Sequence, residues 1–312
     1  RRRPLPRHGL ALSAAAALLA EGGLVRTPLS DLLSRRPSQN LVAEIEPAGA
    51  TQRTLCLMCH LDTSRSGLMF DPRFVGHLNR WLTLQSAACM AQAADPIAGR
   101  TPAGRVLVGA ARGVLAAGAA ALAERELRGE DVPGGNDNAS GVAVVASLAL
   151  ELAARPLTST RVVILMTGCE EAGMLGAQAF LRSRETRDWL FLNFDNVGAG
   201  TLHFLEREGL IRKWPADPAL LSVARRLAGE RPELGIRAAP GPIGLTYDAT
   251  PVLARGGRAL TLVAAVGGSI PNYHWPSDTA ANVEPEAIER ALAAGRELIA
   301  AVDRGEAEGG GS

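Results

Sequence analysis

The sequence predicts an α/β fold with a mostly parallel, mixed β-sheet that is flanked by helices on both faces. Segments typical of strands and of helices alternate along the 312 residues. Most strand segments are continuous apolar runs, which indicates strands that are buried on both faces. The composition, 47% hydrophobic and 21% charged, is that of a globular protein. We expect a single domain over residues 1–312, because a chain of this length can enclose one large core.

The first three elements illustrate the pattern. Residues 9–21 are rich in alanine and leucine and stop at the glycine pair 22–23, which is typical of a helix and its end. Residues 40–46 alternate as a strand does. Residues 54–59 form an apolar run that ends at His60, as a central strand would.

The remaining elements continue the alternation. Further helices are predicted at 139–154, 173–183, 217–229, 248–255 and 284–302. Further strands are predicted at 161–167, 189–195, 201–205, 234–238 and 258–264. Strands that alternate with helices in this way form a sheet covered on both faces.

Charge and cysteine content argue against two classes of protein. The net charge is +1, which gives no indication of a nucleic-acid partner. Cys56 and Cys59 lie three apart on one predicted strand and therefore point to opposite faces, which argues against a local disulfide. No second pair completes a zinc ribbon, so we expect free thiols.

Potential metal ligands recur where the predicted strands end. Ligands gather at the carboxyl ends of the strands in sheets of this kind. The residues at this edge are His60, Asp137, Glu171, Asp195 and His274, with Glu170 beside them. Zinc binds imidazole and carboxylate groups, and two ions can share one carboxylate. The set therefore suits two zinc ions and leaves Glu170 to act as a general base.

Each of these residues, taken alone, also has a purely structural explanation. An adjacent Glu-Glu pair before a helix can be a solvated first turn, and Asp137 can be a helix cap. Tyr273 can serve packing, and Asp248 and Asp278 fit cap and loop positions. The joint pattern favours the metal site, because five ligands at one edge are hard to assign to chance.

Five segments resemble motifs of the M28 family of zinc aminopeptidases, in the family's order. They are Cys59-His60-Leu61-Asp62-Thr63, Gly135-Asn136-Asp137-Asn138-Ala139-Ser140-Gly141, Cys169-Glu170-Glu171-Ala172-Gly173, Asn193-Phe194-Asp195 and Tyr273-His274-Trp275-Pro276-Ser277-Asp278-Thr279. The resemblance runs from about residue 37 to 303. It implies a zinc-exopeptidase type of sheet, two zinc ions per chain and peptide substrates.

The resemblance also implies a role for each site residue. One zinc would be bound by His60 and Asp195, the other by Glu171 and His274, and Asp137 would bridge them, with a cis peptide bond to Asn138. Glu170 would be the general base. Asp62 would hydrogen-bond His60 and fix its tautomer, and Tyr273 would donate a hydrogen bond to the oxyanion.

The expected reaction is release of an N-terminal residue from a peptide. Glutaminyl cyclases with one zinc, and some carboxypeptidases, share much of this ligand set and remain alternatives. A non-catalytic interaction ectodomain is a further alternative, although such relatives lose ligands or the base and none is missing here. The preferred residue, the peptide length and the oligomeric state do not follow from the sequence.

A large insertion separates the first ligand from the bridging aspartate. Residues 64–131 contain two helix-like stretches, 74–94 and 105–128, and predict a helical hairpin. The first stretch fits an amphipathic helix whose apolar face comprises Val75, Leu78, Leu82 and Cys89.

Three surroundings for this hairpin stay open. It could pack on the domain or on a second subunit, lie on a membrane surface, or span a membrane. Arg112 in the second stretch and the polar residues of the first, among them Gln85 and Gln92, argue against a span. The resemblance favours an extracytoplasmic or membrane-associated location, and no signal peptide is visible.

Overall fold

The computed structural model describes residues 37–241 and 245–308, together with 12–13, 16–17, 19–20, 22–23 and 32. Most of the predicted helix 9–21 lies outside the described residues. The chain divides into two compact units. One comprises residues 36–64 and 132–312, and the other comprises 65–131 together with 1–35.

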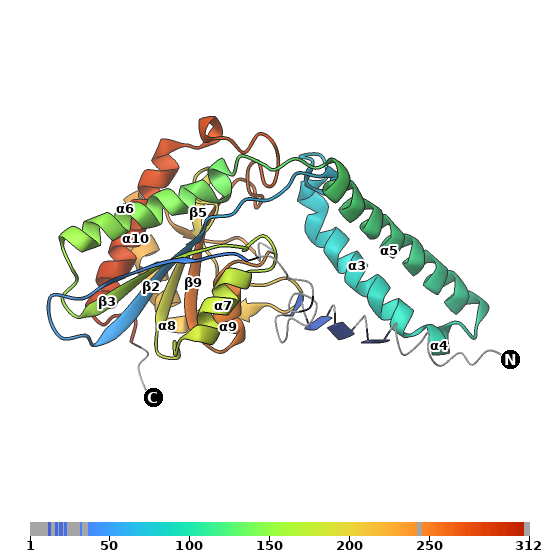
Figure 1. Cartoon of the computed structure of the whole chain (residues 1–312), viewed down its shortest axis with the longest axis horizontal. Helices are drawn as coiled ribbons and strands as arrows, with labels where there is room; N and C mark the ends of the chain where they lie inside the picture. Colours follow the sequence, from blue (N-terminus) through green and yellow to red (C-terminus); the bar gives the residue numbers. More distant parts are fainter. Residues whose placement is uncertain are drawn as a thin grey trace. The chain divides into compact units, whose positions relative to one another are not determined.

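The larger unit is built on a seven-stranded sheet in the order β1-β3-β2-β4-β9-β5-β8 (Figure 1). The strands are β1 (Leu41–Ile45), β2 (Arg53–His60), β3 (Thr160–Thr167), β4 (Leu190–Phe194), β5 (Thr201–Phe204), β8 (Arg237–Ala238) and β9 (Arg258–Ala265). Strands β3, β2, β4 and β9 run parallel, whereas β1 and β5 pair antiparallel with β3 and β9. The predicted mostly parallel, mixed sheet is confirmed. A separate pair, β6 (Arg207–Glu208) and β7 (Trp214–Pro215), was not predicted.

The apolar runs explain why β2 and β3 lie inside the sheet, each between two other strands. Every residue from Leu55 to Cys59 is fully buried, because the strand is covered on both faces. The two strands pair in register up to their ends, where His60 lies opposite Thr167. Both strands therefore end at the same edge, and the residues that follow them lie close together.

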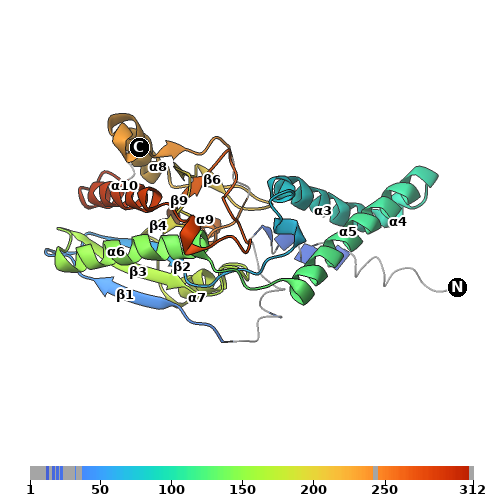
Figure 2. The same cartoon turned by 90° about the horizontal axis from the view of Figure 1, so that it is seen from above.

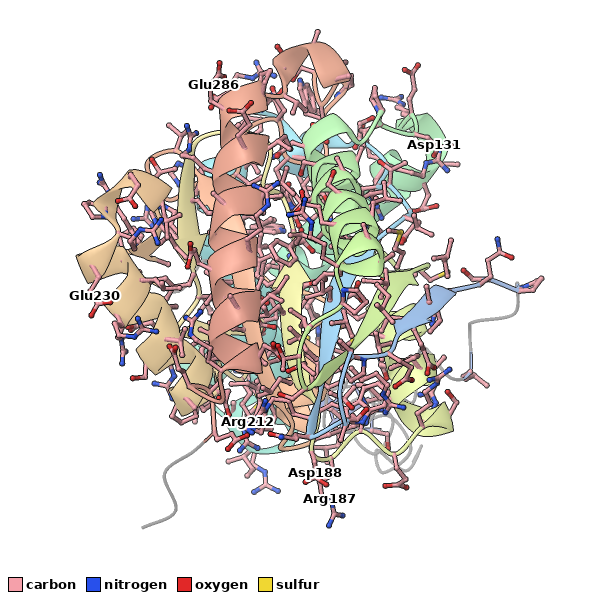
Figure 3. The ribbon with its side chains drawn as sticks, turned by 90° about the vertical axis from the view of Figure 1, so that its left-hand side faces the viewer. Asp131, Arg187, Asp188, Arg212, Glu230 and Glu286 are labelled. Carbon is pink, nitrogen blue, oxygen red and sulfur yellow. The ribbon has the colours of Figure 1, made fainter. Side chains whose placement is uncertain are left out.

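Helices cover both faces of the sheet, as predicted. Helices α6 (Ser140–Ala154), α8 (Pro218–Glu230) and α10 (Pro285–Asp303) lie side by side over one face, as Figure 3 shows. Their leucines, such as Leu148, Leu227 and Leu298, pack with Leu57 and Leu192 of the sheet in the main hydrophobic core. Helices α7 (Leu175–Ser183) and α9 (Thr250–Ala254) contact each other at the other face (Figures 1 and 2).

The smaller unit contains the predicted helical hairpin. Helix α3 (Leu78–Ala93) is followed by the short α4 (Asp95–Ala98) and by α5 (Pro102–Arg128), which returns alongside α3 (Figure 1). The hydroxyl of Thr101 caps α5 by accepting a hydrogen bond from the amide of Gly104, and a proline at the first helical position favours this start.

The amphipathic pattern predicted for the first helix is only partly right. Leu78 is buried and Leu82 is half-buried, but the apolar side chains of Leu84 and Met90 are 47% and 54% exposed. Val75 precedes α3 in a 3-10 turn. The simple pattern fails because polar side chains of α3 take up part of the side that faces α5.

The chain leaves and re-enters the larger unit at one point. The hydroxyl of Thr63 donates a hydrogen bond of 3.0 Å to the carbonyl of Val132, and the amide of Val132 donates one of 3.0 Å to the carbonyl of Ser64. These bonds hold the two ends of the inserted stretch together.

Candidate metal centre

All five predicted metal ligands lie at the carboxyl edge of the sheet. His60 is the last residue of β2, and Asp195 directly follows β4. Glu171 lies in the turn between β3 and α7, and Asp137 lies in the short helical segment η3 (Gly135–Ala139) before α6. His274 lies in the turns that follow β9. The fold therefore brings together side chains that are far apart in sequence.

These side chains form two groups that share Asp137. Nε2 of His60 lies 3.2 Å from Oδ1 of Asp137 and 3.5 Å from Oδ2 of Asp195. Nε2 of His274 lies 3.2 Å from Oδ2 of Asp137 and 3.1 Å from Oε1 of Glu171. Within each group, the ligand atoms lie within 4.8 Å of one another. Asp137 presents one oxygen to each group, as a carboxylate that bridges two metal ions does.

The hydrogen bonds of the two imidazoles suit metal binding. Nδ1 of His60 lies 3.0 Å from the backbone carbonyl oxygen of Asp62, which can only accept, so Nδ1 carries the proton. In the neutral ring, Nε2 then carries a lone pair and can only accept a hydrogen bond. The carboxylate oxygens that it faces can only accept as well, so two acceptors meet. A cation between them resolves this conflict. Nδ1 of His274 lies 3.1 Å from the hydroxyl of Ser64, an equivalent contact on the second ring.

Glu171 gives a second indication that a cation fits. Its Oε1 is buried and lies 3.1 Å from Nε2 of His274, but no described residue gives it a hydrogen bond of good geometry. A buried carboxylate oxygen without a partner is costly unless it binds a cation. Imidazole nitrogen and carboxylate oxygen are the ligands that catalytic zinc sites use. The residues present therefore fit two zinc ions.

In this cluster the histidines and the carboxylates stabilise each other's charged forms, against the opposing effect of burial. Burial alone would lower the pKa of His274, but the carboxylates of Glu171 and Asp137 raise it to about 9. Burial likewise opposes the charged form of His60, whose pKa is nevertheless raised well above its usual range by Asp195 and Asp137. Burial would raise the pKa of Asp137, but both histidines lower it. A site with this charge distribution is built to hold positive charge.

Glu170 lies beside these groups in surroundings that disfavour its charged form. Burial raises the pKa of its carboxyl group well above the usual range, and the neighbouring carboxylates of Glu171 and Asp195 raise it further, against the opposing effect of His60. The residue remains partly exposed. A raised pKa brings a glutamate closer to the pH at which a general base works best.

Asp62 contacts the site differently from what the resemblance implies. Its Oδ1 is 3.8 Å from Nδ1 of His60, too far for a hydrogen bond, and the backbone carbonyl makes that contact instead. The carboxylate accepts hydrogen bonds of 3.0 and 3.1 Å from the amides of Glu170 and Glu171. Asp62 therefore orients three residues of the site at once.

Asp137 is held by a network that the sequence did not reveal. The peptide bond between Asp137 and Asn138 is cis, as the resemblance implies. The carboxylate of Asp278 accepts hydrogen bonds from the amides of Asn136, at 2.7 Å, and Asp137, at 3.0 Å. The interpretation of Asp278 as a cap or loop residue is therefore incomplete, because it is 1% exposed and supports the shared ligand.

The ring of Tyr273 stacks on His274, with ring centroids 3.8 Å apart and an interplanar angle of 23°. Burial raises the pKa of its hydroxyl well above the usual range, so the group stays protonated. Its predicted role as a hydrogen-bond donor to the oxyanion stays a prediction.

Asp248 is fully buried rather than a solvated loop residue. Its Oδ2 accepts a hydrogen bond from the hydroxyl of Thr167 at the end of β3, whereas its Oδ1 has no hydrogen-bond partner within the described part of the chain. Burial raises its pKa to about 7. The neighbouring Tyr247 is buried too, and its hydroxyl has no partner among the described residues. No local sequence signal distinguished these residues from a polar turn.

Solved structures of peptidases share the fold. The structure of BSAP, a zinc aminopeptidase from Bacillus subtilis, is similar with a TM-score of 0.53 and 16% identity, over 84% of this chain and 49% of that one. The aminopeptidase from Aneurinibacillus sp. strain AM-1 gives a TM-score of 0.52 and 19% identity, over 85% and 48%. This chain thus spans about half the length of these two proteins.

A Bacteroides thetaiotaomicron glutaminyl cyclase bound to N-acetylhistamine is also similar, with a TM-score of 0.52 and 16% identity, over 84% of this chain and 76% of that one. Among curated protein sequences, none matches. The profile of peptidase family M28 matches residues 116–299, more than half of the chain, and this stretch contains Asp137, Glu170, Glu171, Asp195 and His274. The chain therefore belongs to peptidase family M28.

Proposed function

We propose that this chain is an aminopeptidase that uses two zinc ions and Glu170 as a general base. The observation that carries the proposal is the pair of ligand groups that share the carboxylate of Asp137. A site for one ion does not need a second histidine on the other oxygen of the same carboxylate. Membership of family M28 supports a peptidase, and the structurally similar aminopeptidases support cleavage at the N-terminus of the substrate.

The zinc ions, when bound, would polarise the scissile carbonyl and make a water molecule more acidic. His60 and Asp195 would hold one ion and Glu171 and His274 the other. Glu170 would take the proton of the attacking water and deliver it to the leaving amine. The hydrogen bonds from the amides of Glu170 and Glu171 to Asp62 fix this turn and so fix the position of the base.

The fold does not separate an aminopeptidase from a glutaminyl cyclase, because both occur among the similar structures. Two measurements on the full chain separate them. Metal analysis after equilibration with zinc should give two ions per chain. A panel of aminoacyl-p-nitroanilides and of peptides with free N-termini should release the first residue, whereas blocked N-termini should not react.

Each contrary result has a clear meaning. One zinc per chain together with cyclisation of N-terminal glutamine would establish the cyclase instead. Release of the C-terminal residue would establish a carboxypeptidase. Two bound zinc ions without turnover of any peptide would favour a binding module that has kept the site.

A further inference from the structure

Helix α5 is unusually apolar for a helix with so little burial. Two helical segments of the described chain are long and apolar enough to cross a membrane, Pro102–Arg128 and Gly135–Ala154. In the segment Gly135–Ala154, which contains α6, 44% of the most apolar stretch is buried, as expected for a helix that packs on the sheet. In α5 only 17% of the corresponding stretch is buried. Only Val108 and Ala111 are buried within α5. A helix that is apolar on all sides normally lies in a core or in a membrane.

The two charged side chains inside the apolar stretches of the hairpin form an ion pair. Residues 81–98 contain one charged side chain, Asp95, and residues 106–123 contain one, Arg112. The guanidinium of Arg112 donates a hydrogen bond of 3.1 Å to the carboxylate of Asp95. It also lies 3.3 Å from Oε1 of Gln92. The two charges that oppose insertion of the apolar stretches are therefore paired with each other.

Two glutamines of α3, Gln85 and Gln92, point toward α5. Nε2 of Gln85 donates to the backbone carbonyl of Val114 at 2.9 Å, and Nε2 of Gln92 donates to that of Val108 at 2.8 Å. Apolar side chains lie outside instead, and they include Leu84, Met90, Val106, Leu107 and Leu122. Polar groups between the helices and apolar groups outside them suit a hairpin surrounded by hydrocarbon.

The length and the ends of the apolar stretches also match a bilayer. Residues 106–123 of a helix extend over ~27 Å, close to the thickness of a hydrocarbon core. Charged side chains lie beyond both ends, with Arg100 and Arg105 near the tip and Arg80, Arg125 and Arg128 near the base. At the base, Leu68, Phe74, Leu78 and Trp81 line an apolar groove of ≈ 320 Å³. Aromatic and arginine side chains are typical of the membrane–water interface.

We propose that the α3–α5 hairpin inserts into a lipid bilayer and anchors the peptidase there. Hydrocarbon is a better occupant than a second copy of the chain, because the exposed apolar residues of α5 are spread around the helix except where α3 packs against it. They include Val106, Leu107, Ala110, Ala116 and Ala119. A second copy covers one side of a helix, whereas lipid covers every side that α3 leaves open.

The test compares matched variants of the full chain. Ala110→Arg/Ala117→Arg places two arginines on exposed positions inside the apolar stretch, and Ala103→Arg/Leu127→Arg places two on exposed positions of the same helix outside it. Arginine is a good helix former, so all of these changes should be tolerated in water. Partition into phosphatidylcholine–phosphatidylglycerol vesicles is measured by flotation and by resistance to alkaline carbonate.

The wild type and the outer variant should float with the vesicles and resist carbonate. The inner variant should lose partition by on the order of 100-fold for each arginine near the middle of the stretch. Asp95→Ala should weaken partition by leaving Arg112 unpaired, and Asp95→Ala/Arg112→Leu should restore it.

Two results would overturn the proposal. One is a wild-type chain that stays in the soluble fraction. The other is a lipid-free dimer, seen by sedimentation, that the inner variant dissociates, because this would assign the apolar surface to a second copy. Neither readout depends on peptidase activity, so the test is independent of the proposed function.

Discussion

Oδ2 of Asp278 accepts a hydrogen bond of 3.0 Å from the backbone amide of Asp137, the residue whose carboxylate both ligand groups share. The contact joins the turns after β9 to the segment before α6. It fixes the position of the shared ligand through its backbone, and it leaves the side-chain oxygens of Asp137 for the two histidines.

Asp278→Asn should weaken both stability and zinc binding. The amide nitrogen of asparagine cannot accept, so one of two buried backbone amides loses its partner, which costs about 1–3 kcal/mol. Urea unfolding and a zinc titration measure the two effects. Asp188→Asn, at an exposed position, is the control and should change neither. An unchanged zinc affinity in Asp278→Asn would show that the contact does not position Asp137.

Glu170→Gln should retain zinc and lose turnover. The substitution keeps the shape of the side chain but removes the proton acceptor, which should reduce kcat by ~10²–10⁴-fold. Metal analysis and the initial rate on an aminoacyl-p-nitroanilide should be measured on the same preparation, with Glu185→Gln as an exposed control. Full activity of Glu170→Gln would refute its assignment as the base.

Removal of zinc should destabilise the larger unit. Chelation leaves the buried carboxylates of Asp137, Asp195 and Glu171 close together without the cations that offset their charge. Zinc at 1,000 times its dissociation constant should restore about 4 kcal/mol, which thermal unfolding measures as a shift in Tm. His274→Ala should reduce the shift, whereas His203→Ala, outside both ligand groups, should not. Equal shifts in the two variants would contradict the assignment of His274.

Stability should fall as the pH rises from about 4.5 to about 7, through Glu208. Its carboxyl group accepts hydrogen bonds from Thr250 and Thr261 in a buried position, and burial raises its pKa from 4.5 to about 7. The folded state therefore binds more protons than the unfolded state in this window. The contribution of Glu208 to the free energy of unfolding is complete below pH 4.5 and lost by about pH 7. It amounts to about 3 kcal/mol.

Glu208→Gln is neutral at every pH and should flatten this part of the curve. Urea unfolding at pH 5, 6, 7 and 8 gives the comparison. Glu206→Gln is the control, because Glu206 is more exposed and pairs with Arg225 at the surface. If the wild type and Glu208→Gln have parallel curves, Glu208 does not titrate in this range.

The sequence predicted the sheet, and the place of the candidate metal ligands at its edge, for a common physical reason. Short apolar runs such as 54–59, alternating with longer helical segments, indicate strands covered on both faces, and the residues that follow parallel strands lie at one edge. His60 and Asp195 were found in this way. The helix predicted from 173 begins at Leu175 instead, because Gly173 and Met174 have positive φ angles of 103° and 55°, which a right-handed helix does not allow.

The features that the sequence could not predict depend on hydrogen-bond partners far away in the chain, or on strands too short to leave a pattern. Asp278 gains its role from amides more than a hundred positions earlier in the chain. Glu208 lies in a strand of two residues, too short to leave a pattern. The sequence alone argues against a membrane span because of its polar residues Gln85, Gln92 and Arg112. The folded hairpin gives each of these side chains a hydrogen-bond partner.

The hydrogen bonds between Thr63, Ser64 and Val132 make the hairpin a modular attachment. Because its two ends meet, the segment between them can lengthen, shorten or be exchanged without altering the order of the strands. If the hairpin anchors the chain as proposed, its sequence can change without altering the strands that carry the candidate metal ligands. For the protein engineer, a short linker between Ser64 and Val132 offers a direct route to a smaller protein that keeps the candidate metal ligands.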